Sequence, residues 1–73
     1  MSSEDPQDVA IAGDMIRLGQ LLKLSGLADS GGEARELVTE GVVRVNGVVE
    51  LRRGRQLHSG DVVEVNGERV RVA

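Results

Sequence analysis

The chain has 73 residues, no cysteine, no aromatic residue and a formal net charge of −3. This length suits one small domain without a buried catalytic cleft, and the missing cysteines exclude disulfides and thiolate metal sites. The missing aromatic rings exclude stacking on unpaired bases, which is the usual way in which proteins hold single-stranded nucleic acid.

Charge is distributed unevenly along the chain. The first 14 residues carry four acidic residues and no basic one, whereas the remainder carries nine basic residues against eight acidic ones. We therefore expect residues 1–7 to form a disordered acidic tail and residues 8–73 to form a single, mildly basic domain. No apolar stretch approaches the roughly 20 residues of a membrane helix and no signal peptide is recognisable, so we expect a cytoplasmic protein that does not enter membranes.

The first half of the domain is predicted to hold a short strand and two helices. The sequence DVAIA at residues 8–12 suggests the strand. In IRLGQLLKLSGL, at residues 16–27, leucines recur at helical spacing. The second helix is predicted to begin at Ser30, because Ser30 and Glu33 have the spacing of a capping box, and to end at Gly41.

The second half repeats one short pattern, with VVRVNG at residues 42–47 and VVEVNG at residues 62–67. Apolar residues alternate with polar ones in both copies, which predicts strands. In the second copy, a two-residue turn at Asn66 would pair Glu64 with Arg69 and leave alternate valines on one face.

The first copy is predicted to turn differently. A two-residue turn there would place Val43 opposite Glu50 and mix the buried and exposed faces of the strands. A three-residue loop at residues 45–47 would instead pair Val43 with Val49 and leave Glu50 outside. Together, these elements predict an α+β fold, in which two packed helices lie against a small, mostly antiparallel sheet of about four to five short strands.

The sequence shows no catalytic constellation. Its single histidine, His58, lies in a turn-rich segment with no second ligand or nucleophile at a recognisable spacing. Ser25, Ser30 and Ser59 each suit a position in a helix end or a turn. We therefore expect a protein that is not an enzyme and that needs no metal and no cofactor.

Two segments are suited to meeting phosphate groups. Gly31 and Gly32 follow the predicted helix cap, so their backbone N–H groups stand at the positive end of the helix dipole, although a plain cap with permissive glycines explains them equally well. Arg52, Arg53 and Arg55 offer three guanidinium groups for paired hydrogen bonds to phosphate, with a solvated surface as the alternative.

Three further cations are spread over the predicted elements. Lys23 lies on the first helix, Arg35 on the second helix and Arg44 on the outward side of a strand. If the helices pack beside that sheet, these three would join the arginine run on one basic face, which favours binding to a polyanion.

Four motifs follow one another between roughly residues 16 and 66. They are a leucine-rich first helix, a Ser-led second helix with a Glu-Ala-Arg run, a Gly-x-Val-x-Val-Asn-Gly turn and a later Gly-Asp before a strand. The residues are Arg17, Leu18, Leu21 and Leu22; Ser30, Glu33, Ala34, Arg35, Leu37 and Val38; Gly41, Val43, Val45, Asn46 and Gly47; and Gly60, Asp61, Val63 and Val65. This order resembles the S-four RNA-binding domain, a family named after a small-subunit ribosomal protein. Gly19 and Gly31 depart from the pattern, because family members often carry an Asp and a basic residue at these positions.

The resemblance, which is nearest to small stand-alone bacterial members, implies binding of structured RNA. The expected RNA is ribosomal or tRNA-like, and the two helix starts and the adjoining strand turn would contact it. The residues assigned to RNA binding are Lys23, Gly31, Gly32, Arg35, Arg44, Asn46, Arg52, Arg53 and Arg55. We expect a monomer whose partners are structured RNA and, through it, the ribosome.

The leading hypothesis is a non-enzymatic RNA-binding module that recognises the shape of folded RNA through phosphate and 2′-hydroxyl contacts. The alternative is a protein-interaction module whose arginines dock an acidic partner, which could itself be ribosome-associated. A sulfur-carrier-like protein is disfavoured, because the C-terminal sequence VRVA lacks a terminal Gly-Gly pair.

Overall fold

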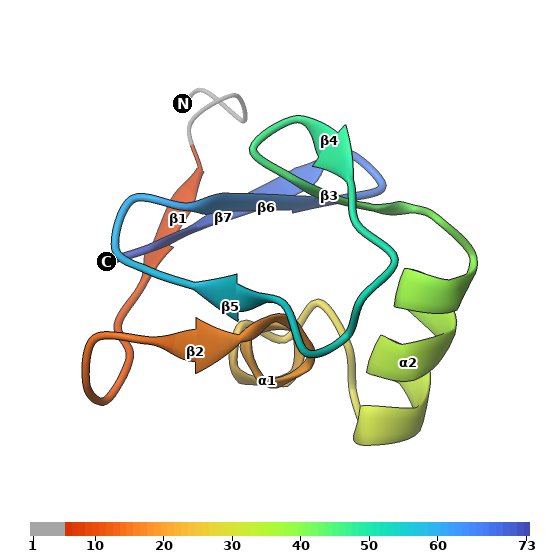
Figure 1. The fold of residues 1–73 in the computed structure, drawn as a ribbon, viewed down its shortest axis with the longest axis horizontal. Helices are drawn as coiled ribbons and strands as arrows, with labels where there is room; N and C mark the ends of the chain where they lie inside the picture. The colour runs from red at the N-terminus through yellow and green to blue at the C-terminus, as the bar shows by residue number, and fades with distance from the viewer. Residues whose placement is uncertain (1–5) are drawn as a thin grey trace.

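A computed structural model describes residues 6–73 of the chain. Its elements, shown in Figure 1, are β1 Gln7–Val9, β2 Ile16–Arg17, α1 Leu18–Leu24, α2 Gly31–Thr39, β3 Val43–Val45, β4 Val48–Val49, β5 Gln56–Leu57, β6 Val62–Val65 and β7 Glu68–Val72. Of the predicted acidic tail, residues 1–5 lie outside the described residues and Gln7 belongs to β1. The strand predicted at residues 8–12 is β1, which ends at Val9. In the described part of the chain, no helix is long and apolar enough to span a bilayer.

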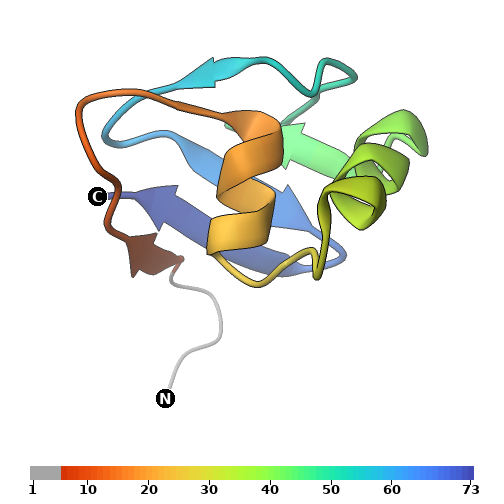
Figure 2. The same cartoon turned by 90° about the horizontal axis from the view of Figure 1, so that it is seen from below.

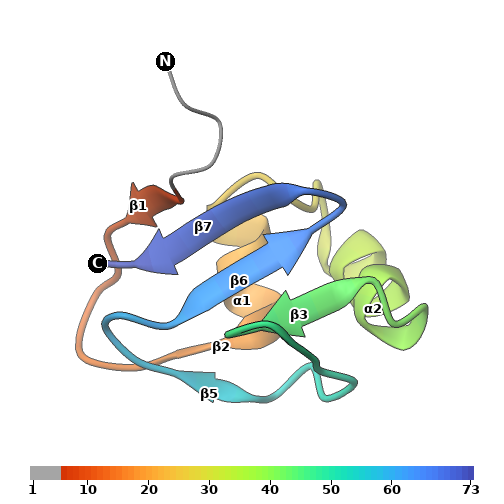
Figure 3. The ribbon, with the colours of Figure 1, turned by 90° about the horizontal axis from the view of Figure 1, so that it is seen from above.

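The molecule has two layers, a five-stranded sheet and a helical layer. The strand order of the sheet is β1-β7-β6-β3-β4, with β1 parallel to β7 and all other neighbours antiparallel. Both helices lie on the same face of this sheet (Figure 1, Figure 2), and the opposite view shows the sheet in front of them (Figure 3). β2 and β5 form a separate two-stranded sheet beside α1. The predicted α+β fold is confirmed.

The hydrophobic core lies between the sheet and the helices, and the alternation of valines places it there. In β3, Val43 and Val45 are buried while Arg44 between them is exposed, as expected for a strand with one covered face. The buried side chains of the core are Leu18, Leu21, Leu22, Ala28, Ala34, Val38, Val43, Val45, Leu57, Val63, Val65, Val70 and Val72. Because all of them are aliphatic, the fold depends on close packing of small and branched side chains.

The two predicted helices are present, but the first is shorter than predicted. Residues 16–17 pair with β5 as strand β2, and α1 ends at Leu24. The start of α2 follows the prediction, since Oγ of Ser30 accepts a hydrogen bond from the backbone N–H of Glu33 at 3.1 Å. The Glu33 carboxylate accepts from the N–H of Asp29 and not from that of Ser30, so the return bond of the capping box is displaced by one residue.

The two copies of the Val-Asn-Gly pattern make the same turn. Asn46 and Asn66 both have φ 52°, and the glycines after them have φ 86° and 87°. Val45 pairs with Val48 directly across the first turn. Both are two-residue hairpin turns in which the two central residues are left-handed. The register predicted for the second copy is confirmed, whereas the three-residue loop predicted for the first copy is wrong.

The burial of Glu50 explains this error. The prediction kept Glu50 outside so that valines and charged residues would stay on separate faces of the strands. In the structure Glu50 is only 7% exposed, and two arginine side chains donate hydrogen bonds to it. Val48 and Val49 are exposed instead, at 69% and 42%, and Val49 stands opposite the exposed Arg44 on the uncovered face of the sheet.

Candidate functional site

The segment that follows β4, residues 50–55, folds against the start of α1; we call it the arginine loop. The backbone N–H groups of Leu18 and Gly19 donate to the carbonyls of Arg55 and Arg53, at 2.8 and 2.9 Å respectively. The first four N–H groups of any helix lack an acceptor inside the helix. Two of these donors in α1 are therefore satisfied by the arginine loop, and the start of α1 is less open to an anion than the sequence implied.

Glu50 lies at the centre of the hydrogen bonds within the arginine loop. Its Oε1 accepts from Nη1 of Arg55 at 2.7 Å, and its Oε2 accepts from Nε of Arg52 at 3.0 Å. The backbone N–H of Arg52 donates to the same Oε2 at 3.0 Å. The side-chain bonds from Arg52 and then from Arg55 lower the pKa of the Glu50 carboxyl to about 2, against the opposing effect of burial. Glu50 is therefore ionised at neutral pH and offsets one of the three positive charges of the loop.

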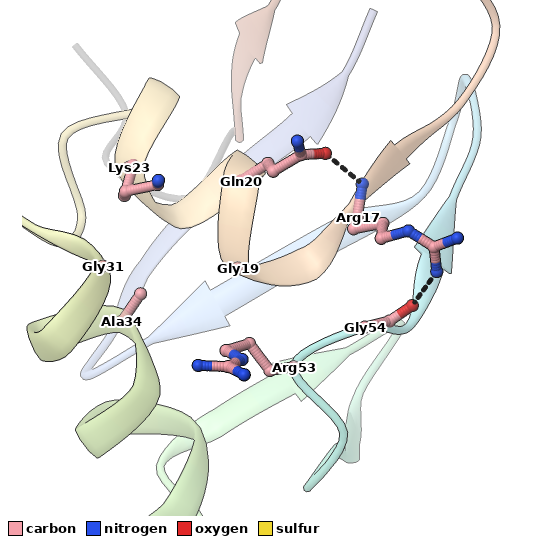
Figure 4. A pocket seen from close by; sticks show the side chains of 8 residues that line it. All are labelled: Arg17, Gly19, Gln20, Lys23, Gly31, Ala34, Arg53 and Gly54. Carbon is pink, nitrogen blue, oxygen red and sulfur yellow. Dashed lines mark hydrogen bonds between the residues drawn. The ribbon is translucent and has the colours of Figure 1, made fainter.

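An open groove of about 440 Å³ lies between α1, α2 and the arginine loop; we call it the α1–α2 groove. Its lining residues are Arg17, Gly19, Gln20, Lys23, Gly31, Ala34, Arg53 and Gly54 (Figure 4). Three of these residues are cations and none is an acid. Arg53 has no ion-pair partner within residues 6–73, so its full charge is available to a bound anion.

Two contacts of glycine and arginine shape the wall of the α1–α2 groove. A Cβ atom at Gly19 would stand 2.8 Å from Cγ of Arg53, which is closer than side chains tolerate. Gly19 thus leaves the space in which Arg53 lies across the first turn of α1, with its guanidinium directed toward α2 in Figure 4. On the other side of the loop, Nη1 of Arg17 donates to the carbonyl of Gly54 at 2.9 Å.

Lys23 and the start of α2 meet at another part of the groove. Nζ of Lys23 lies 4.0 Å from the position that a Cβ atom would take on Gly31. Gly31 and Gly32 are exposed and directly follow the cap residue Ser30, so their N–H groups have no acceptor inside the helix. A cation and a helix donor therefore stand together, in an arrangement suited to a phosphate oxygen.

Arg35 and Arg44 lie apart from this groove. Arg35 lines a separate hollow on the outer side of α2 together with Gly32, Glu36, Thr39 and Glu40. Arg44 is exposed on the face of the sheet that the helices do not cover. The basic face that was expected to unite Lys23, Arg35 and Arg44 is therefore not formed, because the helices cover one face of the sheet and Arg44 points from the other.

Asn46 is held by contacts within the protein. Its Nδ2 donates to Oδ1 of Asp61 at 3.1 Å, and its Oδ1 accepts from the backbone N–H of Val62 at 3.0 Å. Oδ2 of Asp61 accepts from the N–H of His58 at 2.8 Å. Burial raises the pKa of Asp61, but the hydrogen bonds from His58 and Asn46 and the charges of Arg55 and His58 together bring the pKa below its ordinary value. The Asn46 side chain therefore joins the first hairpin turn to the turn before β6.

A third hollow, of about 700 Å³, adjoins the α1–α2 groove at Gly54. Its lining residues are Arg17, Arg52, Gly54, Arg55, Gln56, His58 and Asp61. Arg17 and Gly54 line both this hollow and the α1–α2 groove. Arg17 therefore lies between the groove and the two arginines that pair with Glu50. Sequence reasoning did not assign Arg17 to the site, although its position next to the first helix was visible. It also missed Glu50, whose place just before the arginine run was the available signal.

Comparison with known proteins finds relatives over most of the chain. Residues 9–73 match the family model described as S4 domain. The chain is 48% identical over 59 residues to the probable ribosome maturation protein RlbA of Bacillus subtilis, covering 81% of this chain and 83% of RlbA. It is 39% identical over 57 residues to the putative RNA-binding protein YbcJ of Escherichia coli, covering 78% of this chain and 81% of YbcJ.

Solved structures of such proteins have the same fold. The solution structure of YbcJ from E. coli superimposes with a TM-score of 0.73 and 30% identity, covering 100% of this chain and 94% of that one. The 30S ribosomal protein S4e of Thermoplasma acidophilum gives a TM-score of 0.63 and 28% identity, covering 82% of this chain and 32% of S4e. The family match and these identities together show that the chain belongs to the S4 domain family.

Proposed function

We propose that this protein is a non-enzymatic, monomeric and cytoplasmic RNA-binding module whose α1–α2 groove contacts the phosphate backbone of structured RNA. The observation that carries the proposal is the convergence of Arg17, Lys23 and Arg53 on one groove that no acid lines. The relatives agree with it, since RlbA is named a probable ribosome maturation protein and YbcJ a putative RNA-binding protein. We therefore propose ribosomal RNA as the ligand.

The chemistry of the groove favours recognition of shape over recognition of unpaired bases. Guanidinium and ammonium groups and helix N–H donors bind phosphate oxygens, and the chain has no aromatic side chain on which a base could stack. If Arg17, Lys23 and Arg53 each neutralise one phosphate, the logarithm of the affinity should fall with the logarithm of salt concentration with a slope of roughly −2 to −3.

The proposal is tested by filter binding of the protein to a folded ribosomal RNA fragment, with polyglutamate as the competitor. Arg53→Gln should weaken binding by about tenfold, the worth of one charge-assisted hydrogen bond, and should reduce the salt slope by about 1. Arg69→Gln is the matched control, because it removes the same charge from β7, away from the groove.

Two outcomes would contradict the proposal. Equal weakening by Arg53→Gln and Arg69→Gln would mean that only the net charge matters and that the groove is not the site. Easy displacement of RNA by polyglutamate would favour a module that docks an acidic protein.

A further inference from the structure

Glu50 is the one buried charged residue among residues 6–73, and its carboxylate accepts hydrogen bonds only from within its own loop. Its side chain is 9% exposed, whereas the side chains of its partners Arg52 and Arg55 are 75% and 34% exposed. A second bond from Arg52, from Nη2 to Oε1 at 3.3 Å, completes a two-pronged contact with the carboxylate. The Glu50 carboxylate thus holds the side chains of both Arg52 and Arg55.

Apart from its contacts with Arg17, Leu18 and Gly19, the arginine loop has few other bonds that define its shape. Residues 50–55 belong to no strand or helix, and within the loop itself one backbone hydrogen bond is present, from the N–H of Arg55 to the carbonyl of Arg52 at 3.2 Å. The carbonyls of Arg53 and Arg55 nevertheless meet the first turn of α1 at hydrogen-bonding distance. This docking requires a defined loop conformation, and the Glu50 carboxylate supplies the bonds that define it.

We infer that Glu50 is a positioning residue for RNA binding: it holds Arg52 and Arg55 so that Arg53, between them, is presented to the α1–α2 groove. The inference rests on the proposed function. The arginine run then contains two kinds of residue. Arg52 and Arg55 hold the loop, whereas Arg53, which has no acidic partner within the described residues, contacts the RNA. A carboxylate that belongs to an RNA-binding surface would then assist the binding of a polyanion.

If only charge mattered, replacing Glu50 would have the opposite effect on RNA affinity. Replacing Glu50 by Gln removes a negative charge near the RNA, and Coulomb attraction through water would then tighten binding by about twofold. If Glu50 positions the loop, the same change should weaken binding by about fivefold or more, as is typical of coupling between two sites. The direction of the change therefore separates the two explanations.

The experiment compares Glu50→Gln with Glu64→Gln, which removes the same charge from the middle of the sheet. RNA affinity is measured by filter binding to the folded ribosomal RNA fragment. Amide hydrogen exchange of Leu18 and Gly19 is measured by NMR, because their N–H groups donate to the arginine loop. The N–H of Val72, which donates to the carbonyl of Asp61 at 2.9 Å, reports on the rest of the fold.

In Glu50→Gln, RNA binding should be weaker, and amide exchange should accelerate more at Leu18 and Gly19 than at Val72. Binding that is unchanged or tighter, or exchange that stays at the wild-type rate, would overturn it. Arg53→Gln in the same series keeps the two proposals apart. If Arg53→Gln binds RNA as well as wild type, the proposed function fails; if only Glu50→Gln does, the inference alone fails.

A second variant guards against loss of the fold in Glu50→Gln. The double change Arg52→Lys with Arg55→Lys leaves every formal charge in place but removes the planar guanidinium groups that grip the carboxylate. It should also weaken RNA binding and accelerate exchange at Leu18 and Gly19. Weaker binding with unchanged exchange would mean that the two arginines contact RNA directly, and the positioning role would be rejected.

Discussion

Nδ2 of Asn46, in the first copy of the repeated pattern, donates a hydrogen bond of 3.1 Å to Oδ1 of Asp61, the residue just before the second copy. Asn66 occupies the same place in the second copy and has the same φ of 52°, yet no side-chain bond of Asn66 is present within residues 6–73. The two copies therefore share a turn but differ in task. The first copy forms a turn and also bonds to the segment at the start of β6, whereas the second copy forms only a turn.

This difference predicts unequal costs for the same substitution. Asn46→Ala and Asn66→Ala both place alanine in a left-handed conformation, but only Asn46→Ala also loses two hydrogen bonds. We expect Asn46→Ala to lower the free energy of unfolding by about 1 to 3 kcal/mol more than Asn66→Ala does. Urea unfolding followed by circular dichroism measures this, since the chain has no aromatic fluorophore. Equal losses would show that the two side-chain bonds of Asn46 add nothing to stability.

Gly19→Ala should separate RNA binding from stability. Alanine favours a helix over glycine by about 1 kcal/mol, so the protein should remain folded. The new methyl group would, however, collide with Cγ of Arg53 and displace its guanidinium from the groove, which should reduce RNA affinity by about tenfold.

The matched control for this change is Gly19→Ala made in an Arg53→Ala background. Cγ of Arg53 is absent there, so the new methyl group has no arginine side chain to displace. An equal fall in RNA affinity with and without the Arg53 side chain, or no fall in wild type, would contradict the role given to the space at Gly19.

Arg44 stands directly opposite Glu64 in neighbouring strands, and Glu64 stands directly opposite Arg69. Arg44→Glu would place two glutamates across from each other, and we expect it to cost about 0.2 to 1 kcal/mol in stability. Adding Glu64→Gln should restore most of that loss. Because Arg44 lies on the sheet face away from the helices, Arg44→Glu should also reduce RNA affinity less than Arg53→Glu. Equal reductions would return Arg44 to the RNA-binding site.

Acid should weaken the fold partly through Glu50. The folded-state pKa of Glu50 is lowered from 4.5 to about 2, so its ionised form contributes stability above about pH 4.5 that is lost as pH falls toward 2. We expect the stability difference between wild type and Glu50→Gln to be largest at neutral pH and to shrink through this window. Asp61, whose pKa is also lowered, remains in both proteins and cancels in the comparison. A difference that does not depend on pH would contradict this account.

Local signals were enough to predict much of the fold. The cap at Ser30, the helix that follows it and the register of the second hairpin depend on residues close together in sequence, and each is found as predicted. The first hairpin was predicted wrongly because the rule that charged residues lie outside was applied to Glu50. That rule fails when more exposed arginines can reach a buried carboxylate and pair with it, and alternation of residue types does not show such pairing.

The candidate site was harder to predict because it is assembled from distant segments. Charge and residue type alone identified Lys23, Gly31 and Arg53, which the fold brings to one groove. They also selected Arg35 and Arg44, which the fold places elsewhere. The alternation in β3 already indicated that Arg44 lies on the side opposite the buried valines. The grouping of Lys23 with Arg53 depends instead on how segments distant in sequence pack together, which the sequence pattern does not show.

The parallel pairing of β1 with β7 has a consequence for the order of folding. The ion pair of Asp8 and Arg71 in these strands spans 63 positions of the chain, whereas the hairpins each close over two residues. Hairpins form within about 1 to 10 microseconds, while contacts distant in sequence form later. β1 should therefore be the last strand to dock and the first to detach. Whenever it is detached, β7 becomes an unpaired edge that can recruit a second molecule, so β1 protects the protein from aggregation.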